Sequence, residues 1–304
     1  MLVPRRSQTV QRRLVSSLVA IVISLLAPLA MRAEDKPAAA AAQAIPAQRV
    51  FSAGHSFHVF VPPLLSEVAR SAGIKEHESL GLSAIGGSRV IQHWNVPDDK
   101  NNAKKALRAG TADVLTLSPI HLPDDGIEKF VALAVEHNPN VRVTVQEFWL
   151  PFDIYDITFR QRPAKVDHNA PTIEQLRSLH APYFQSMDEH VAALNKQFGK
   201  PIVFVVPVGQ SVIALREKII AGQAPGLKQQ EDLFTDAIGH ARPALQVLNA
   251  YCHFAVIYRR TPVGLPPPKV LGSVGDAETS AALNKLLQEL AWDAVVHHPL
   301  SGVK

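Results

Sequence analysis

The chain has 304 residues, 47% of them hydrophobic and 19% charged, a composition that allows a substantial buried core and excludes a wholly disordered protein. It contains 31 Lys and Arg against 27 Asp and Glu, but five of the Arg lie within residues 1–33, where there is no acidic residue. The remainder, with 26 basic and 27 acidic residues, is nearly neutral. We therefore expect no basic face and no nucleic-acid partner.

The first 33 residues have the pattern of a secretory signal peptide. Several Arg within residues 1–13 precede an apolar run at 14–29, and a cleavage zone with Ala at both ends follows at 30–33. The apolar run is shorter than the roughly 20 residues of a membrane-spanning helix and is interrupted by Ser and Pro, so cleavage is favoured over a permanent anchor. We expect a secreted or periplasmic protein without a stable membrane anchor, in which an Ala-rich linker at 34–47 leads into one domain at 48–304.

Strands and helices are predicted to alternate along this domain. The apolar segments expected to form strands are 49–53, 80–85, 112–117, 141–148 and 202–208. The segments expected to form helices are 61–71, 101–109, 124–137, 172–198, 244–258 and 277–297. This alternation predicts an α/β fold, a three-layer α/β/α sandwich with a mainly parallel sheet. The Pro-containing stretch 149–171 lacks such a pattern and is expected to be an insertion that could wall a cleft.

The loops that follow parallel strands gather at one edge of the sheet, where such folds bind their ligands. After the first three predicted strands these loops contain Gly54, Gly86 and Ser118. The first loop presents Ser56 shortly after an apolar strand that ends in Gly. A serine at a strand-to-helix turn places its hydroxyl at the sheet edge and its backbone N–H near a helix N-terminus. Ser56 is therefore a candidate nucleophile, although serines after glycine are also common turn residues.

A carboxylate and a histidine lie close together far downstream, at Asp236 and His240. An Asp that accepts a hydrogen bond from one imidazole nitrogen fixes the tautomer, so that the other nitrogen can take a proton from a serine hydroxyl. The order Ser, Asp, His, with the last two close in sequence, is compatible with this chemistry. No G-x-S-x-G pattern surrounds Ser56, which argues against an α/β-hydrolase.

The chain resembles the SGNH (GDSL-like) hydrolase superfamily, in particular its divergent exported bacterial members. The resemblance depends on Gly54-His55-Ser56, on Ile85-Gly86-Gly87-Ser88, and on Asp236–His240 followed by Asn249-Ala250-Tyr251 and the stretch 261–266, and it spans nearly all of residues 48–268. It implies a flavodoxin-like fold and a serine esterase that requires no cofactor. Ser56 would be the nucleophile, His240 the general base and then acid, and Asp236 its orienting partner.

The resemblance also implies donors for an oxyanion. Ser56 and either Gly86 or Gly87 would supply backbone N–H groups. The family's Gly-x-Asn-Asp block is replaced here by Leu117-Ser118-Pro119-Ile120-His121, so Ser118 or His121 is expected in place of the third donor. The Asp–His pair is also one residue longer than the family's Asp-x-x-His, and Gly239 is the extra residue.

The remaining candidates have competing interpretations. Cys252 is the only cysteine, so no intramolecular disulfide is expected, and its apolar surroundings predict a buried, inert thiol. The 13 His show neither a His-Glu-x-x-His motif nor a Cys pair beside them, so no metal site is expected. His55 is expected to form a wall of the site or to contact substrate, and His253 to lie in the core. Trp94 and Trp149 are candidates for stacking on a sugar ring, although core packing is the more common role of such residues.

The function that the sequence favours is an exported serine esterase, and the resemblance implies acyl or acetyl esters of carbohydrates as substrates. The alternative is a non-catalytic SGNH-like protein that binds a carbohydrate or a cell-envelope component, which the replaced Asn block favours. A metal-dependent hydrolase is a third hypothesis, which loss of activity on chelation would reveal.

Overall fold

The computed structural model describes residues 46–156, 158 and 160–304. The predicted signal peptide at 1–33 and most of the predicted linker at 34–47 lie outside the described residues. In the described part of the chain, no helix is both long and apolar enough to cross a bilayer.

Five strands form one sheet in which every neighbouring pair is parallel. They are β1 (Arg49–Gly54), β2 (Glu78–Ala84), β3 (Val114–Leu117), β4 (Arg142–Gln146) and β5 (Val203–Val206), in the spatial order β2-β1-β3-β4-β5. Every residue of β3 and β5 is buried, as is typical of parallel strands covered on both faces. The centre of the sheet therefore lies in the core of the domain.

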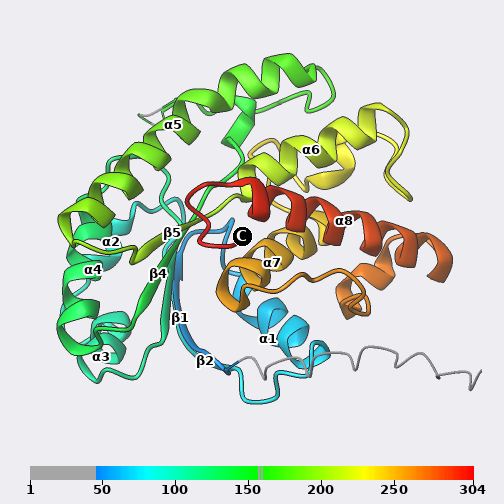
Figure 1. Ribbon diagram of the computed structural model, residues 1–304. Coiled ribbons are helices and arrows are strands. Elements are labelled where there is room, and N and C mark those ends of the chain that lie inside the picture. The colour runs from blue at the N-terminus through cyan, green and yellow to red at the C-terminus, as the bar shows by residue number, and fades with distance from the viewer. Residues whose placement is uncertain (1–45, 157, 159) are drawn as a thin grey trace, which may run out of the picture. The chain divides into compact units, whose positions relative to one another are not determined.

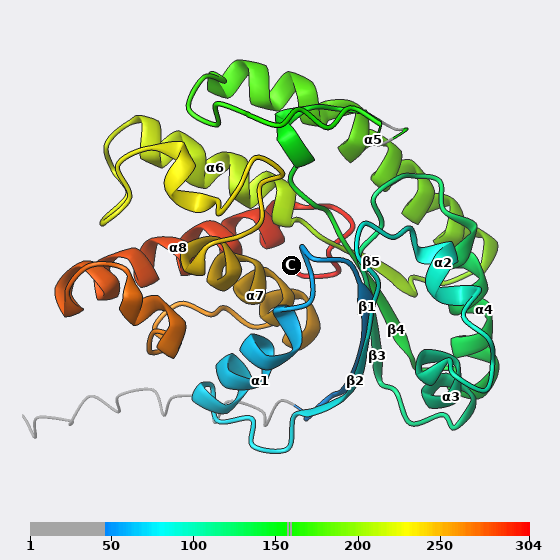
Figure 2. The ribbon, with the colours of Figure 1, turned by 180° about the vertical axis from the view of Figure 1, so that it is seen from behind.

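Helices cover both faces of this sheet (Figures 1 and 2). On one side lie α2 (Val90–Trp94), α3 (Asn102–Arg108), α4 (Asp125–His137) and α5 (Ile173–Gln197). On the other side lie α1 (Val61–Ser71), α6 (Val208–Ile220), α7 (Pro243–Tyr258) and α8 (Ala277–His297). Three short 3-10 helices complete the described elements: η1 (Pro151–Asp153), η2 (Gln230–Leu233) and η3 (Lys269–Ser273). The predicted three-layer α/β/α sandwich with a parallel sheet is confirmed.

Two helices are not predicted by the sequence. The five residues of α2 are too few for a periodic signal, and a tertiary contact holds its start: the buried carboxylate of Asp124 accepts the N–H groups of Val90 and Ile91 at 2.8 and 3.0 Å. The other missed helix, α6, continues the apolar run of β5. Pro207 lacks the N–H that a strand needs, so the strand ends at Val206 and the helix begins at Val208.

Helix α7 is buried on nearly its whole surface, as expected for a helix that is apolar all round. It carries Cys252, whose Sγ lies 3.3 Å from Ser211 Oγ. Burial raises the pKa of this thiol to about 12, so it is protonated and unreactive at neutral pH. The next residue, His253, is also fully buried, and its Nε2 lies 3.0 Å from Gln146 Oε1.

The end of β1 leaves room only for glycine. A Cβ at Gly54 would lie 2.8 Å from the Cβ of His58, and that ring cannot swing away easily because its Nδ1 is 2.8 Å from Gln146 Oε1. We expect Gly54→Ala to lower the free energy of unfolding by about 1–3 kcal/mol, measured by urea denaturation. Gly272→Ala is the matched control, because no described atom lies within 4 Å of its added Cβ. Equal stability of the two variants would contradict the close packing under β1.

Candidate active site

Ser56 lies in a turn between β1 and α1, at the carboxyl end of the sheet. The carbonyl of His55 accepts the N–H groups of His58 and Val59 at 2.8 and 3.2 Å and closes this turn. The carbonyl of Phe57 accepts two side-chain donors, Gln146 Nε2 at 3.1 Å and Asn249 Nδ2 at 3.3 Å. The half-buried serine is thus held from both sides by main-chain contacts of its neighbours.

Asp236 and His240 lie in a narrow hairpin formed by residues 234–241, which we call the Asp–His hairpin. Phe234 and Ala241 pair in antiparallel fashion, and the N–H of Thr235 donates to the carbonyl of His240 at 2.9 Å. Gly239 closes the turn at φ +94°, a value that residues with a Cβ rarely adopt. The extra residue noted in the sequence is accommodated at this point, and the Asp and His side chains remain in contact.

The three side chains form a hydrogen-bonded row. Asp236 Oδ2 lies 2.6 Å from His240 Nδ1, and His240 Nε2 lies 2.9 Å from Ser56 Oγ. The other carboxylate oxygen, Asp236 Oδ1, accepts the N–H groups of Gly239 at 3.1 Å and His240 at 3.2 Å. Partial burial opposes ionisation of Asp236, but these hydrogen bonds, first of all the one from His240, outweigh it and lower its pKa. The anionic carboxylate accepts Nδ1–H, which leaves Nε2 able to accept the proton of the Ser56 hydroxyl.

This row opens onto a cleft of about 350 Å³. The residues lining it are His55, Ser56, Phe57, Gly86, Gly87, Ile120, Phe148, Pro151, Arg162, Ile238 and His240. Among the described residues, no acceptor takes the N–H groups of Ser56, Gly86 or Gly87. They are therefore available to a ligand in the cleft.

The loop that carries Gly86 and Gly87 is braced by a histidine of α2. His93 accepts or donates at both ring nitrogens, with Ser83 Oγ and Ser88 Oγ each 2.7 Å away. Burial lowers the pKa of His93 to about 4, so the ring is neutral and can pair with both hydroxyls. The two serines fix the start and the end of this loop.

Comparison with solved structures identifies a protein whose fold is similar over most of this chain. A DUF4886 family protein from Bacteroides uniformis matches over 100% of its own chain and 85% of this one, at 14% identity and a TM-score of 0.51. The fold resembles that of this DUF4886 protein. A protein from Parabacteroides merdae described as a GDSL-like lipase matches over 95% of its own chain and 68% of this one, at 12% identity and a TM-score of 0.41. No protein-family model matches the sequence, and the comparison with curated proteins yields no match.

Two residues expected as the third oxyanion donor are absent from the described lining of the cleft. Ser118 is buried beneath His55, with its Oγ 3.1 Å from His55 Nε2, and its N–H donates to Ala53 within the sheet. His121 lines a separate, smaller cavity beside Tyr155. Pro119 and Ile120 follow Ser118, and of the two it is Ile120 that lines the cleft. Neither residue predicted as the third donor therefore belongs to the described lining of the cleft.

His55 lines the cleft, and its ring is uncharged and held in place by two hydrogen bonds. Its Nδ1 accepts the N–H of Phe57 at 3.3 Å, and its Nε2–H can then donate to Ser118 Oγ. Burial lowers the pKa of His55 to about 3, so the ring carries no charge at neutral pH.

Neither predicted tryptophan contributes to the described lining of the cleft. Trp94 packs edge-on against Phe130, with its ring centroid 5.1 Å away, and Lys104 Nζ lies 4.2 Å from the Trp94 ring, so Trp94 is a packing residue of the α2–α4 layer. Trp149 is buried and stacks on Phe57 at 4.4 Å, and its Nε1–H donates to the carbonyl of Gly239 at 2.8 Å. It therefore supports the Asp–His hairpin from behind and does not face the cleft.

Several residues that hold the site together are not predicted from the sequence. Gln146 ends β4 and accepts hydrogen bonds from both His58 and His253 while its amide donates to Phe57. Gln146 has no distinguishing signal in the sequence, because other polar residues also lie in the predicted strand 141–148. Pro151 and Arg162 line the cleft from the predicted insertion 149–171, and Phe148 lines it from the end of the predicted strand before it.

Proposed function

We propose that this chain is an exported serine hydrolase of the esterase type. The observation that carries the proposal is the Asp236–His240–Ser56 row, with contacts of 2.6 and 2.9 Å, opening onto a cleft. The likeness to the DUF4886 protein is one of fold and does not bear on the chemistry. Export is proposed from the signal pattern of residues 1–33 alone.

The row supports an acyl-transfer mechanism. Ser56 Oγ attacks an ester carbonyl while His240 Nε2 takes the hydroxyl proton, and Asp236 stabilises the imidazolium that forms. The carbonyl oxygen becomes an oxyanion that the N–H groups of Ser56 and Gly87 can bind. His240 then gives its proton to the leaving alcohol, and an acyl-serine remains. Water, activated by His240, hydrolyses this intermediate and restores the enzyme.

The cleft suggests a slow enzyme. The family pattern provides a third oxyanion donor, whereas neither Ser118 nor His121, the residues expected in its place, belongs to the described lining of the cleft. Loss of one such donor costs about 3 kcal/mol in the transition state, or about two orders of magnitude in rate. A low turnover number with simple esters is thus expected. We propose acyl or acetyl esters of carbohydrates as the substrate class, on the basis of the family resemblance alone.

Labelling with a fluorophosphonate probe tests the proposal, because such a probe reacts covalently with an activated serine. The purified protein from residue 34 onward should be labelled, Ser56→Ala should not, and His240→Ala should be labelled at least about 10³-fold more slowly. Ser178→Ala, at an exposed position of α5, is the matched control and should react like the parent. A folded parent protein that resists labelling would contradict the esterase and favour the non-catalytic binding protein.

A further inference from the structure

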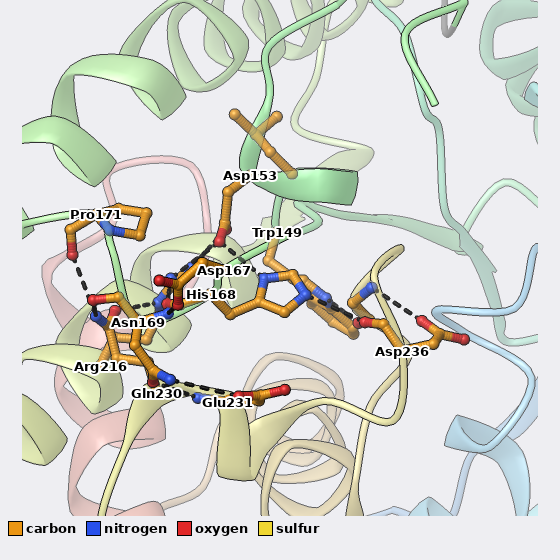
Figure 3. Close-up of polar contacts among 12 residues, drawn as sticks. Trp149, Asp153, Asp167, His168, Asn169, Pro171, Arg216, Gln230, Glu231 and Asp236 are labelled. Atoms are coloured by element: carbon orange, nitrogen blue, oxygen red, sulfur yellow. Dashed lines mark hydrogen bonds and ion pairs between the residues drawn. The ribbon is translucent and has the colours of Figure 1, made fainter. Parts of the chain in front are cut away.

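Three main-chain carbonyls of the Asp–His hairpin each accept a hydrogen bond from one preceding stretch of the chain. The carbonyl of Asp236 faces His168 Nε2 at 3.1 Å, that of Ile238 accepts the N–H of Phe152 at 3.1 Å, and that of Gly239 accepts Trp149 Nε1–H at 2.8 Å. We call Trp149, Phe152 and His168 the clamp residues. They bind the hairpin on both sides of the turn between Asp236 and His240, and Figure 3 shows His168 and Trp149 converging on it.

His168 is the titratable member of the clamp, and both of its nitrogens face acceptors. Nδ1 lies 2.9 Å from the carboxylate oxygen Asp153 Oδ2, and Nε2 lies 3.1 Å from the carbonyl oxygen of Asp236 (Figure 3). A neutral imidazole has one N–H and would leave one acceptor facing a lone pair. Both contacts are hydrogen bonds only if the ring is an imidazolium. The ring of His168 also packs against that of Phe234, with centroids 4.5 Å apart and the planes tilted by 42°.

The charged groups around His168 agree with this assignment. Within the described residues, these are Asp153 of η1 and Arg216 of α6, and Arg216 also donates to the carbonyl of His168 at 2.8 Å. Burial and the nearby guanidinium disfavour a positive ring, but the hydrogen bond and charge of Asp153 outweigh them and raise the pKa of His168. The imidazolium therefore persists to higher pH than that of an ordinary histidine, and it loses its proton as the pH rises through this raised pKa.

We infer that His168 is a positioning residue for the proposed hydrolysis: as an imidazolium it holds the carbonyl of Asp236 and keeps the hairpin in the shape that aligns Asp236 with His240. The inference rests on the proposed function, because it assigns His168 to the alignment of the Ser56–His240–Asp236 row. When His168 loses its proton at alkaline pH, one of the two contacts is lost. The remaining N–H stays on Nδ1 and donates to the Asp153 carboxylate, because a charged acceptor forms the stronger bond, and the Asp236 carbonyl is released.

The pH profile of fluorophosphonate labelling tests this role. In the parent protein the labelling rate should fall at high pH, as His168 loses its proton through its raised pKa. His168→Gln should be labelled about tenfold more slowly at neutral pH, since a hydrogen bond from a charged donor to the hairpin is lost, and its profile should lack the alkaline fall. His297→Gln, exposed on α8, is the matched control and should keep the parent profile.

Hydrogen–deuterium exchange of residues 234–241 supplies a readout that does not depend on activity. After correction for intrinsic exchange, the amides of this segment should exchange faster in His168→Gln than in the parent at neutral pH. In the parent, their exchange should become faster only at alkaline pH. The exchange of β3 should be the same in both proteins at every pH. A labelled parent whose rate, profile and exchange are unaffected by His168→Gln overturns the inference. A parent that is never labelled overturns the proposed function, and exchange alone then decides whether His168 holds the hairpin.

Discussion

Asp236→Asn is expected to lower the rates of labelling and ester hydrolysis by about 10³–10⁴-fold, while the fold is retained. The reason lies in the two N–H groups of Gly239 and His240 that donate to Asp236 Oδ1. Because these two N–H groups need an acceptor, the oxygen of the new amide would take the position of Oδ1. The NH₂ group would then take the position of Oδ2 and point toward His240 Nδ1. The imidazole would then have to accept at Nδ1 and carry its proton on Nε2. In that tautomer it cannot take the proton of Ser56.

The measurement is the rate of hydrolysis of 4-nitrophenyl acetate and of fluorophosphonate labelling, with urea denaturation to confirm that the variant is folded. Asp293→Asn, on the exposed side of α8, makes the same chemical change away from the site and should leave both rates unchanged. A loss of less than about tenfold in Asp236→Asn would mean that Asp236 does not set the tautomer of His240.

Arg216→Met is expected to lower the free energy of unfolding by about 3–5 kcal/mol, the usual cost of removing one partner of a buried ion pair. Arg216 is 1% exposed, and it donates to both oxygens of Asp153 at 2.6 and 3.1 Å and to Gln230 Oε1 at 2.6 Å (Figure 3). Its loss would leave the buried carboxylate with His168 alone. Asp153 and Phe152 also adopt positive φ values of 52° and 60°, a strained backbone that these contacts must hold.

Urea denaturation measures this loss, and the exposed pair of Arg177 and Glu217, 2.7 Å apart, provides the control. Arg177→Met should cost no more than about 1 kcal/mol. Arg216→Lys, which keeps the charge but not the forked geometry, should fall between the two and serves if Arg216→Met does not fold. Equal costs for Arg216→Met and Arg177→Met would contradict a structural role of the buried network.

The direction in which the stability changes with pH follows from the pKa of Asp153. Burial opposes its ionisation, but His168 and Arg216 outweigh burial and lower its pKa. The stability from this network is therefore present above the ordinary carboxyl pKa of about 3.9 and is lost as the pH falls through the lower folded value. The difference in stability between the parent and Arg216→Met should accordingly shrink in acid.

The sequence predicts the fold well because its signals are local. The strands β1, β3 and β5 are short apolar runs bounded by breakers, and α8 runs from Ala277 to His297 as its pattern indicates. The missed helices have a different cause. A tertiary hydrogen bond to Asp124 stabilises α2, and the apolar residues of α6 follow those of β5 without a change of composition.

The residues predicted for the candidate site also form two groups, those with a local sequence signal and those without one. Ser56, Asp236 and His240 have local signals, a Gly at a strand end and an acid four residues before a histidine, and the structure brings their side chains together. Ser118, His121 and Trp94 are chosen from position in the sequence or residue type, and none belongs to the described lining of the cleft. A loop position identifies the sheet edge, but it does not tell which way a side chain points.

By itself, the sequence determined the five strands, the helices other than α2 and α6, and the three side chains proposed for catalysis, because hydrophobic periodicity and turn chemistry act over a few neighbouring residues. Only the tertiary structure decided how these side chains are held. The clamp residues lie between positions 149 and 168, whereas the carbonyls they bind lie between 236 and 239. A hydrogen bond between a side chain and a distant main-chain carbonyl has no pattern in the sequence, since every residue carries that acceptor and packing alone selects which one is reached.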